Sequence, residues 1–93
     1  MLIGGPNDTL IAGHSRDTFV FGPTNFGANT IENFNVQKDT IQIDHTLFAN
    51  FAAVQSHAVQ MGADTVITAD AANTITLEGI ALSHLHEHDF LFV

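Results

Sequence analysis

Three histidines near the C-terminus are the residues of this chain best suited to chemistry. His84, His86 and His88 alternate with other residues in the segment 84–89. On a strand all three imidazoles would share one face, whereas on a helix only His84 and His88 would. Neutral imidazole nitrogens bind Zn²⁺ and Ni²⁺, so either arrangement could hold a transition metal. The alternative, which we favour from the sequence, is a solvated surface cluster that binds metals only opportunistically, because histidine-rich tracts are often merely compositional.

Catalytic motifs are otherwise absent from the sequence. It contains no H-E-x-x-H, no G-x-S-x-G and no G-x-x-x-x-G-K-[ST] motif. It also has no cysteine, which excludes disulfides, thiol catalysis and Cys-type zinc sites. We therefore predict that the chain is not an enzyme. Because Met1 is followed directly by the middle of a repeat, we expect any catalytic activity to lie upstream in a longer protein.

Composition and charge narrow the class of protein further. The 93 residues are enough for one small domain, and 45% apolar against 13% charged residues indicates a folded chain. Two basic and ten acidic residues leave a net charge of −8. This charge argues against nucleic acid and anionic membranes as binding partners and favours divalent cations as ligands. No apolar run approaches the length of a membrane span, and because no basic start is followed by an apolar stretch, we expect no N-terminal signal peptide. We expect a monomer that is not inserted in a membrane.

The elements that would position these residues are mostly short strands. Asp8-Thr9-Leu10 and Asp17-Thr18-Phe19 are nine residues apart, and each follows a glycine-bearing segment, which predicts a turn and a strand twice. Alternating or β-branched residues predict five more strands, at 29–34, 39–44, 64–69, 73–78 and 89–93. In the strand at 39–44, Ile41 and Ile43 are expected to face one side.

One helix is expected, over residues 50–61. Its apolar residues follow helical spacing: Phe51, Val54, Ala58 and Met61. Asn50 is the predicted N-cap, and Gly62 is the predicted left-handed residue that ends the helix. Leu82 and Leu85 indicate one further turn of helix.

Residues 4–20 resemble two degenerate copies of the RTX (hemolysin-type) calcium-binding nonapeptide, G-G-x-G-x-D-x-U-x, where U is a large apolar residue. The order of strands, helix, hairpin and ending that follows is similar to the C-terminal region of serralysin-type proteases and other secreted repeat proteins. The resemblance implies a mainly β fold in a single domain, 1–93. Residues 1–44 would form the end of a short parallel β-roll, and residues 45–93 a helix and hairpin cap.

The resemblance also implies Ca²⁺ between turns that stack on the same side of the roll. It pairs Asp17 with Asp39, and Asp8 with Asn29, as oxygen ligands. The ligand set is weakened, since Pro6 and Ser15 replace glycines, and asparagines stand where the family has aspartates: Asn29, Asn33 and Asn35. We expect weak calcium binding. The alternative is that Asp-Thr pairs simply form turns and start strands without metal.

The ending, Asp89-Phe90-Leu91-Phe92-Val93, is an acidic residue followed by four apolar ones. By resemblance it would be an uncleaved signal for a type I secretion exporter, and the protein would be extracellular. The segment would also form a strand with Phe90 and Phe92 in the core, which is compatible because export precedes folding. The sequence thus predicts a non-catalytic C-terminal calcium-binding, capping and export module. The alternative is a calcium-independent extracellular adhesion or interaction domain with decayed calcium sites.

Overall fold

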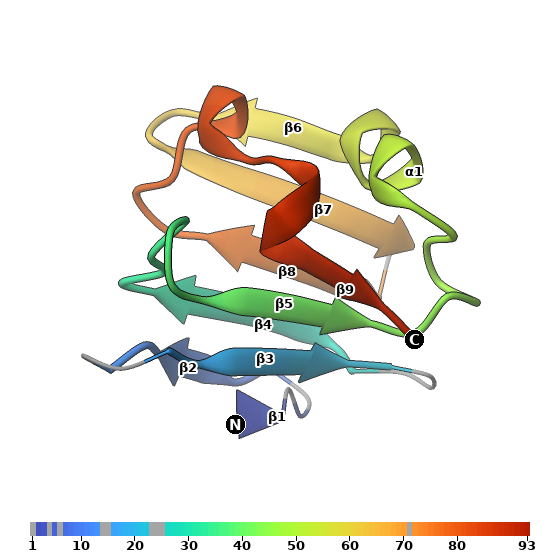
Figure 1. Cartoon of the computed structure of the whole chain (residues 1–93), viewed down its shortest axis with the longest axis horizontal. Helices are drawn as coiled ribbons and strands as arrows, with labels where there is room; N and C mark the ends of the chain where they lie inside the picture. Colours follow the sequence, from blue (N-terminus) through green and yellow to red (C-terminus); the bar gives the residue numbers. More distant parts are fainter. Residues whose placement is uncertain (1, 4, 6, 14–15, 23–25, 71) are drawn as a thin grey trace.

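The computed structural model describes residues 2–3, 5, 7–13, 16–22, 26–70 and 72–93, and it consists of two β-sheets that face each other (Figure 1). The four-stranded sheet has the order β1 (Leu2–Ile3), β3 (Thr18–Phe21), β5 (Thr40–Ile43) and β9 (Phe90–Phe92). The five-stranded sheet has the order β2 (Thr9–Ile11), β4 (Ala28–Glu32), β8 (Asn73–Leu77), β7 (Asp64–Asp70) and β6 (Ala58–Met61). The prediction of a mainly β chain is confirmed.

The first five strands form a short parallel β-roll, as predicted. Strands that follow one another in the chain alternate between the two sheets, and neighbours within each sheet are parallel. The pairing sets Thr9 beside Thr30 in one sheet and Thr18 beside Thr40 in the other. The nine-residue repeat therefore corresponds to one strand and its turn, and two repeats complete one coil.

The last coil of the roll comes from the end of the chain. β8 pairs in parallel with β4, and β9 pairs in parallel with β5, where Phe90 lies beside Ile41. Residues 45–72 are inserted before this coil and contain α1 (Phe51–Ser56) and the antiparallel strands β6 and β7. β7 also pairs antiparallel with β8, so the insertion extends the five-stranded sheet by two strands. The predicted hairpin over 64–69 and 73–78 is confirmed.

The predicted helix over 50–61 is only half formed. Asn50 does cap it, since its Oδ1 accepts the backbone N–H of Ala53 at 3.0 Å. After Ser56, however, residues 58–61 pair with β7 as strand β6, and Met61 is 58% exposed. Gly62, with φ 64°, lies in the turn between β6 and β7 and does not end a helix. A short helix is marginal by itself, and strand pairing with β7 satisfies the backbone of this segment instead.

Side chains that alternate along the strands fill the space between the sheets. Phe19, Ile41 and Phe90 form one row across the four-stranded sheet. Leu10, Ile31 and Leu77 form a row across the facing sheet, and all six side chains are buried. Ile41 and Ile43 are both fully buried, which confirms that they share one face of the strand.

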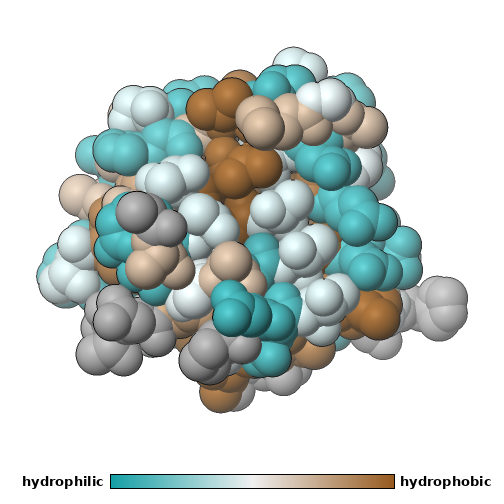
Figure 2. All heavy atoms as spheres, turned by 180° about the vertical axis from the view of Figure 1, so that it is seen from behind, coloured by the Kyte–Doolittle hydropathy of each residue, from teal (hydrophilic) through white to brown (hydrophobic). Residues whose placement is uncertain are grey.

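The outer face of the five-stranded sheet, seen in Figure 2, carries mostly neutral and hydrophilic residues around a hydrophobic patch in the upper part of the view. Thr9, Thr30 and Thr76 are aligned across this sheet by the strand register. On the edge strand β6, Val59 is 54% exposed.

Within the described ranges, none of the helices has the length and apolar character needed to span a membrane.

Candidate functional site: the stacked turns and the last coil

The turns before β3 and β5 are joined by the carboxylate of Asp39. Its Oδ1 accepts the backbone N–H of Asp17 at 2.9 Å, and its Oδ2 accepts the backbone N–H of Asn35 at 2.9 Å. Asp39 is only 3% exposed. Backbone N–H donors stabilise a buried carboxylate in its charged form. One side chain therefore closes its own turn and ties that turn to the preceding coil.

Asn29 has the equivalent position on the other side of the roll. Its Oδ1 accepts the backbone N–H of Asp8 at 3.3 Å, and its Nδ2 donates to the carbonyl of Phe26 at 2.7 Å. Asn29 is 1% exposed. An amide suits this position because one end must accept and the other must donate. A carboxylate here would set an oxygen against the Phe26 carbonyl and would need a proton or a cation between them.

The two remaining predicted ligands close their own turns. Asp8 Oδ2 accepts the backbone N–H of Gly5 at 3.0 Å, and Asp17 Oδ2 accepts that of Gly13 at 2.8 Å. A Cβ at position 5 would lie 2.7 Å from Asp8 Oδ2, so a glycine allows this close approach. The structure thus brings together both pairs expected from the sequence, Asp8 with Asn29 and Asp17 with Asp39. It joins them by backbone hydrogen bonds, and the calcium prediction itself stays a prediction.

Asn73 is a third residue whose side chain joins one coil of the roll to the preceding one, and it was not identified from the sequence. Its Oδ1 accepts the backbone N–H groups of Phe26 and Gly27, each at 2.9 Å, so β8 is tied to the turn before β4. Its Nδ2 donates to both carboxylate oxygens of Asp70, at 2.8 and 2.9 Å. These bonds, followed by one from the Ala72 N–H, lower the pKa of Asp70. The available signal was the sequence Asn-Thr-Ile at 73–75, which repeats that at 29–31.

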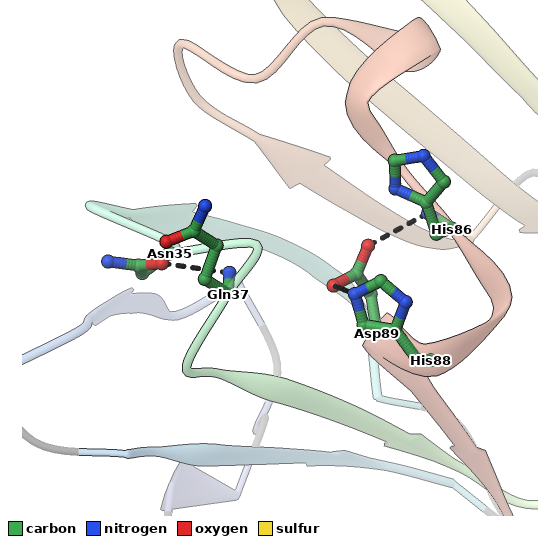
Figure 3. A network of polar contacts seen from close by, with 5 residues as sticks. All are labelled: Asn35, Gln37, His86, His88 and Asp89. Atoms are coloured by element: carbon green, nitrogen blue, oxygen red, sulfur yellow. Dashed lines mark hydrogen bonds and ion pairs between the residues drawn. The ribbon is translucent and has the colours of Figure 1, made fainter.

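The histidines lie in a turn, neither on a strand nor on a regular α-helix. His84 ends the 3₁₀ turn Leu82–His84, and His86 precedes the second 3₁₀ turn, Glu87–Asp89. The imidazole rings of His86 and His88 stack with their centroids 5.4 Å apart and an interplanar angle of 7°. Asp89 is fully buried beside them, and its Oδ2 accepts the backbone N–H of His86 at 2.8 Å (Figure 3).

The predicted terminal strand is present as β9, which follows Asp89. Phe90 is 7% exposed, and its ring lies 5.5 Å from that of Phe51 in α1. Val93 exchanges backbone hydrogen bonds with the end of β5, since its N–H donates to Ile43 and its carbonyl accepts from His45. Phe90 thus belongs to the core as expected, while Phe92 is only partly buried. The segment 89–93 is an integral rung of the roll in the folded chain.

These elements define a short parallel β-roll whose turns are stacked by Asp and Asn side chains and whose last coil is supplied by the C-terminal residues. Among solved structures, the chain is similar to the extracellular lipase LipA from Serratia marcescens, with a TM-score of 0.70 and 23% sequence identity. The match covers 99% of this chain but 18% of the lipase, so the similarity concerns the fold of a small part of that protein. Neither a family model nor a curated protein sequence matches the chain.

Proposed function

We propose that this chain is a non-catalytic C-terminal module of a larger RTX-type secreted bacterial protein, which caps a β-roll, binds calcium weakly and directs export. The observation that carries the proposal is the stacking of turns two strands apart, Asp8 on Asn29 and Asp17 on Asp39. These are the pairs that the nonapeptide repeat places on opposite sides of the roll. The similarity to part of a secreted lipase supports the same reading.

The capping role rests on the unequal ends of the roll. At one end, β1 and β2 are short edge strands that pair with a described strand on one side only, so a further coil can pair along their other side. At the other end, β9 packs against α1 through Phe90 and Phe51, and the hairpin β6–β7 extends beyond β8. A repeat stack needs such an atypical final unit to cover its last rung.

We assign the export role to Asp89–Val93, which a type I exporter would recognise before the chain folds. In the folded chain this segment is β9 and Phe90 is in the core, so the exporter would need the unfolded chain. We expect a passenger fused to this chain to be secreted by such an exporter, and deletion of 89–93 to abolish secretion. Because the deletion also unfolds the last coil, Ile41→Ala serves as the control, since it weakens the same sheet but keeps the segment. Secretion that survives the deletion would exclude this role.

A specific observation favours the calcium-independent alternative, an extracellular adhesion or interaction domain. The Asn29 amide uses both its oxygen and its nitrogen in hydrogen bonds, to the Asp8 N–H and to the Phe26 carbonyl, and so ties its turn to that of Asp8. Calcium titration followed by backbone amide NMR decides between the two, with magnesium as the control. If the amides of Gly13, Asp17 and Asp39 shift together and saturate near millimolar calcium, the calcium-binding reading holds. If they do not move in a chain that is already folded, the sites have decayed.

A further inference from the structure

One carboxylate oxygen in the last coil has no hydrogen-bond partner. Asp89 is fully buried, and within the described part of the chain its Oδ1 is the buried side-chain atom without a hydrogen bond. A buried charged oxygen left unsatisfied costs free energy, so its position calls for a physical cause. The Nε2 of His88 lies 3.5 Å from this oxygen, which is long for a charge-assisted hydrogen bond.

A register change explains why this oxygen is left over. Asp39 uses its two oxygens for its own turn and for the preceding coil. Counting back from the pair of Ile41 and Phe90 aligns His88, rather than Asp89, with Asp39, and Asp89 ends the 3₁₀ turn that precedes β9. Asp89 is therefore one residue out of step with the other stacking residues. Its Oδ2 closes the turn through the His86 N–H, but Oδ1 does not accept a backbone N–H from the preceding coil.

We propose that His86, His88 and Asp89 form a binding site for a borderline divalent cation, Zn²⁺. One ligand atom from each of the three residues can be chosen so that all lie within 4.8 Å of one another. In Figure 3 both imidazole rings lie beside the carboxylate, one above the other. Two imidazole nitrogens and one carboxylate oxygen are a ligand set that zinc accepts, with water in the fourth position. Calcium is disfavoured because it prefers oxygen ligands alone.

The distances suit a zinc ion with little movement of the chain. With bonds of about 2.0–2.1 Å, ligand atoms of a tetrahedral zinc lie about 3.3 Å apart. The separation between His88 Nε2 and Asp89 Oδ1, 3.5 Å, already matches this value. His86 must approach by a change of side-chain rotamer, which is possible because its side chain is exposed. The ligand that does not need to move is Asp89, because its side chain is held by the hydrogen bond from the His86 N–H. The neighbouring residues Leu85 and Phe90 are buried and anchor both ends of this segment.

An ion pair between His88 and Asp89 would involve only one of the two stacked imidazole rings. A zinc ion would use both rings and the orphaned oxygen together. It would also fix the turn that leads directly into β9, so metal binding would hold the last rung of the roll in place.

Calorimetric titration of ZnCl₂ into the metal-free 93-residue chain near neutral pH tests the site. We expect one zinc per chain with a Kd of about 10 μM or lower. His86→Ala and His88→Ala should each weaken binding about tenfold or more. Because both side chains are exposed, these variants should fold normally, which amide NMR spectra verify. Asp89→Asn is a supporting variant and is used only if its spectrum shows the native fold.

His84→Ala and His57→Ala are matched controls, since both histidines are exposed and lie outside the group. Neither should change the affinity, and an excess of Ca²⁺ should not displace zinc. Saturation with zinc should also shift the imidazole nitrogen resonances of His86 and His88. Binding that depends equally on all four histidines, a stoichiometry above one, or a Kd in the millimolar range would overturn the proposal and indicate scattered surface imidazoles.

Discussion

The substitution Asn29→Asp tests the assignment of the stacked turns most directly. Asn29 is 1% exposed, and its Nδ2 donates to the Phe26 carbonyl at 2.7 Å. The variant keeps the size of the side chain and the acceptor that binds the Asp8 N–H. It replaces the donor by a charged oxygen that faces a carbonyl oxygen in a buried site.

The magnitude follows from these contacts. Losing the hydrogen bond costs about 1 kcal/mol, and an uncompensated buried charge brings the total to about 3–5 kcal/mol. For a chain of this size, 3 kcal/mol lowers Tm by about 12–24 °C. If calcium binds between the two oxygens, it restores about 2.7 kcal/mol when its concentration is a hundred times its Kd.

Thermal unfolding monitored by circular dichroism, in chelator and then in millimolar calcium, measures both effects. Asn50→Asp is the matched control, because the same chemical change at the exposed N-cap of α1 keeps the bond to Ala53 and should leave Tm nearly unchanged. The pH dependence gives a second readout. Burial beside a carbonyl raises the pKa of the new carboxyl in the folded state, so the variant should gain stability as pH falls through that pKa.

Two results would contradict this reasoning. If Asn29→Asp melts like the wild type in chelator, the amide does not make the buried bond to Phe26. If the variant is destabilised but calcium does not raise its Tm, the turn pair of Asp8 and Asn29 is not a calcium site even with its charge restored.

Three further predictions concern the last coil and its turns. Asn73→Ala removes the side-chain hydrogen bonds that contribute most to lowering the pKa of Asp70, so NMR titration should show that pKa rising toward 3.8 while the Ala72 N–H bond remains. In the wild type, the stabilisation from these bonds is present above pH 3.8 and is lost as pH falls through the folded pKa. Phe90→Ala should cost about 3–5 kcal/mol in denaturant unfolding, and a loss below about 1 kcal/mol would place β9 outside the core. Gly22→Ala should destabilise more than Gly62→Ala. A Cβ at 22 would lie 3.0 Å from the Cβ of Asp44 and 2.7 Å from a Leu47 methyl carbon, and the φ of 101° at Gly22 is farther than the 64° of Gly62 from the left-handed α region, whereas a Cβ at 62 would meet nothing within 4 Å. Equal losses of about 1–2 kcal/mol would contradict this expectation.

The roll was predictable because its information is local and repeated. Asp-Thr or Asn-Thr followed by a large apolar residue marks both the turn and the start of a strand. The pairing of Asp17 with Asp39 and of Asp8 with Asn29 came from the resemblance to the repeat family, and in the structure these residues are joined by hydrogen bonds. The end of the helix was not predictable from spacing, because residues 58–61 have the apolar spacing of a helix but pair with β7 in a hairpin that turns at Gly62. Competition between a short helix and strand pairing is decided by tertiary structure.

The last coil shows the same limit at the candidate site. Asn73 and Asp89 repeat the residue types of the earlier turns, but the register shifts: Asn29 lies beside Ile75, and Ile41 lies beside Phe90. After this shift Asn73 still reaches the preceding turn, because its amide can accept from two N–H groups and donate to Asp70. The Asp89 side chain has two oxygens and no N–H group, and its Oδ1 has no hydrogen-bond partner beside the imidazoles of the histidine-rich turn. A change of one residue in register therefore converts a turn-stacking carboxylate into a potential metal ligand, which neither composition nor spacing could reveal.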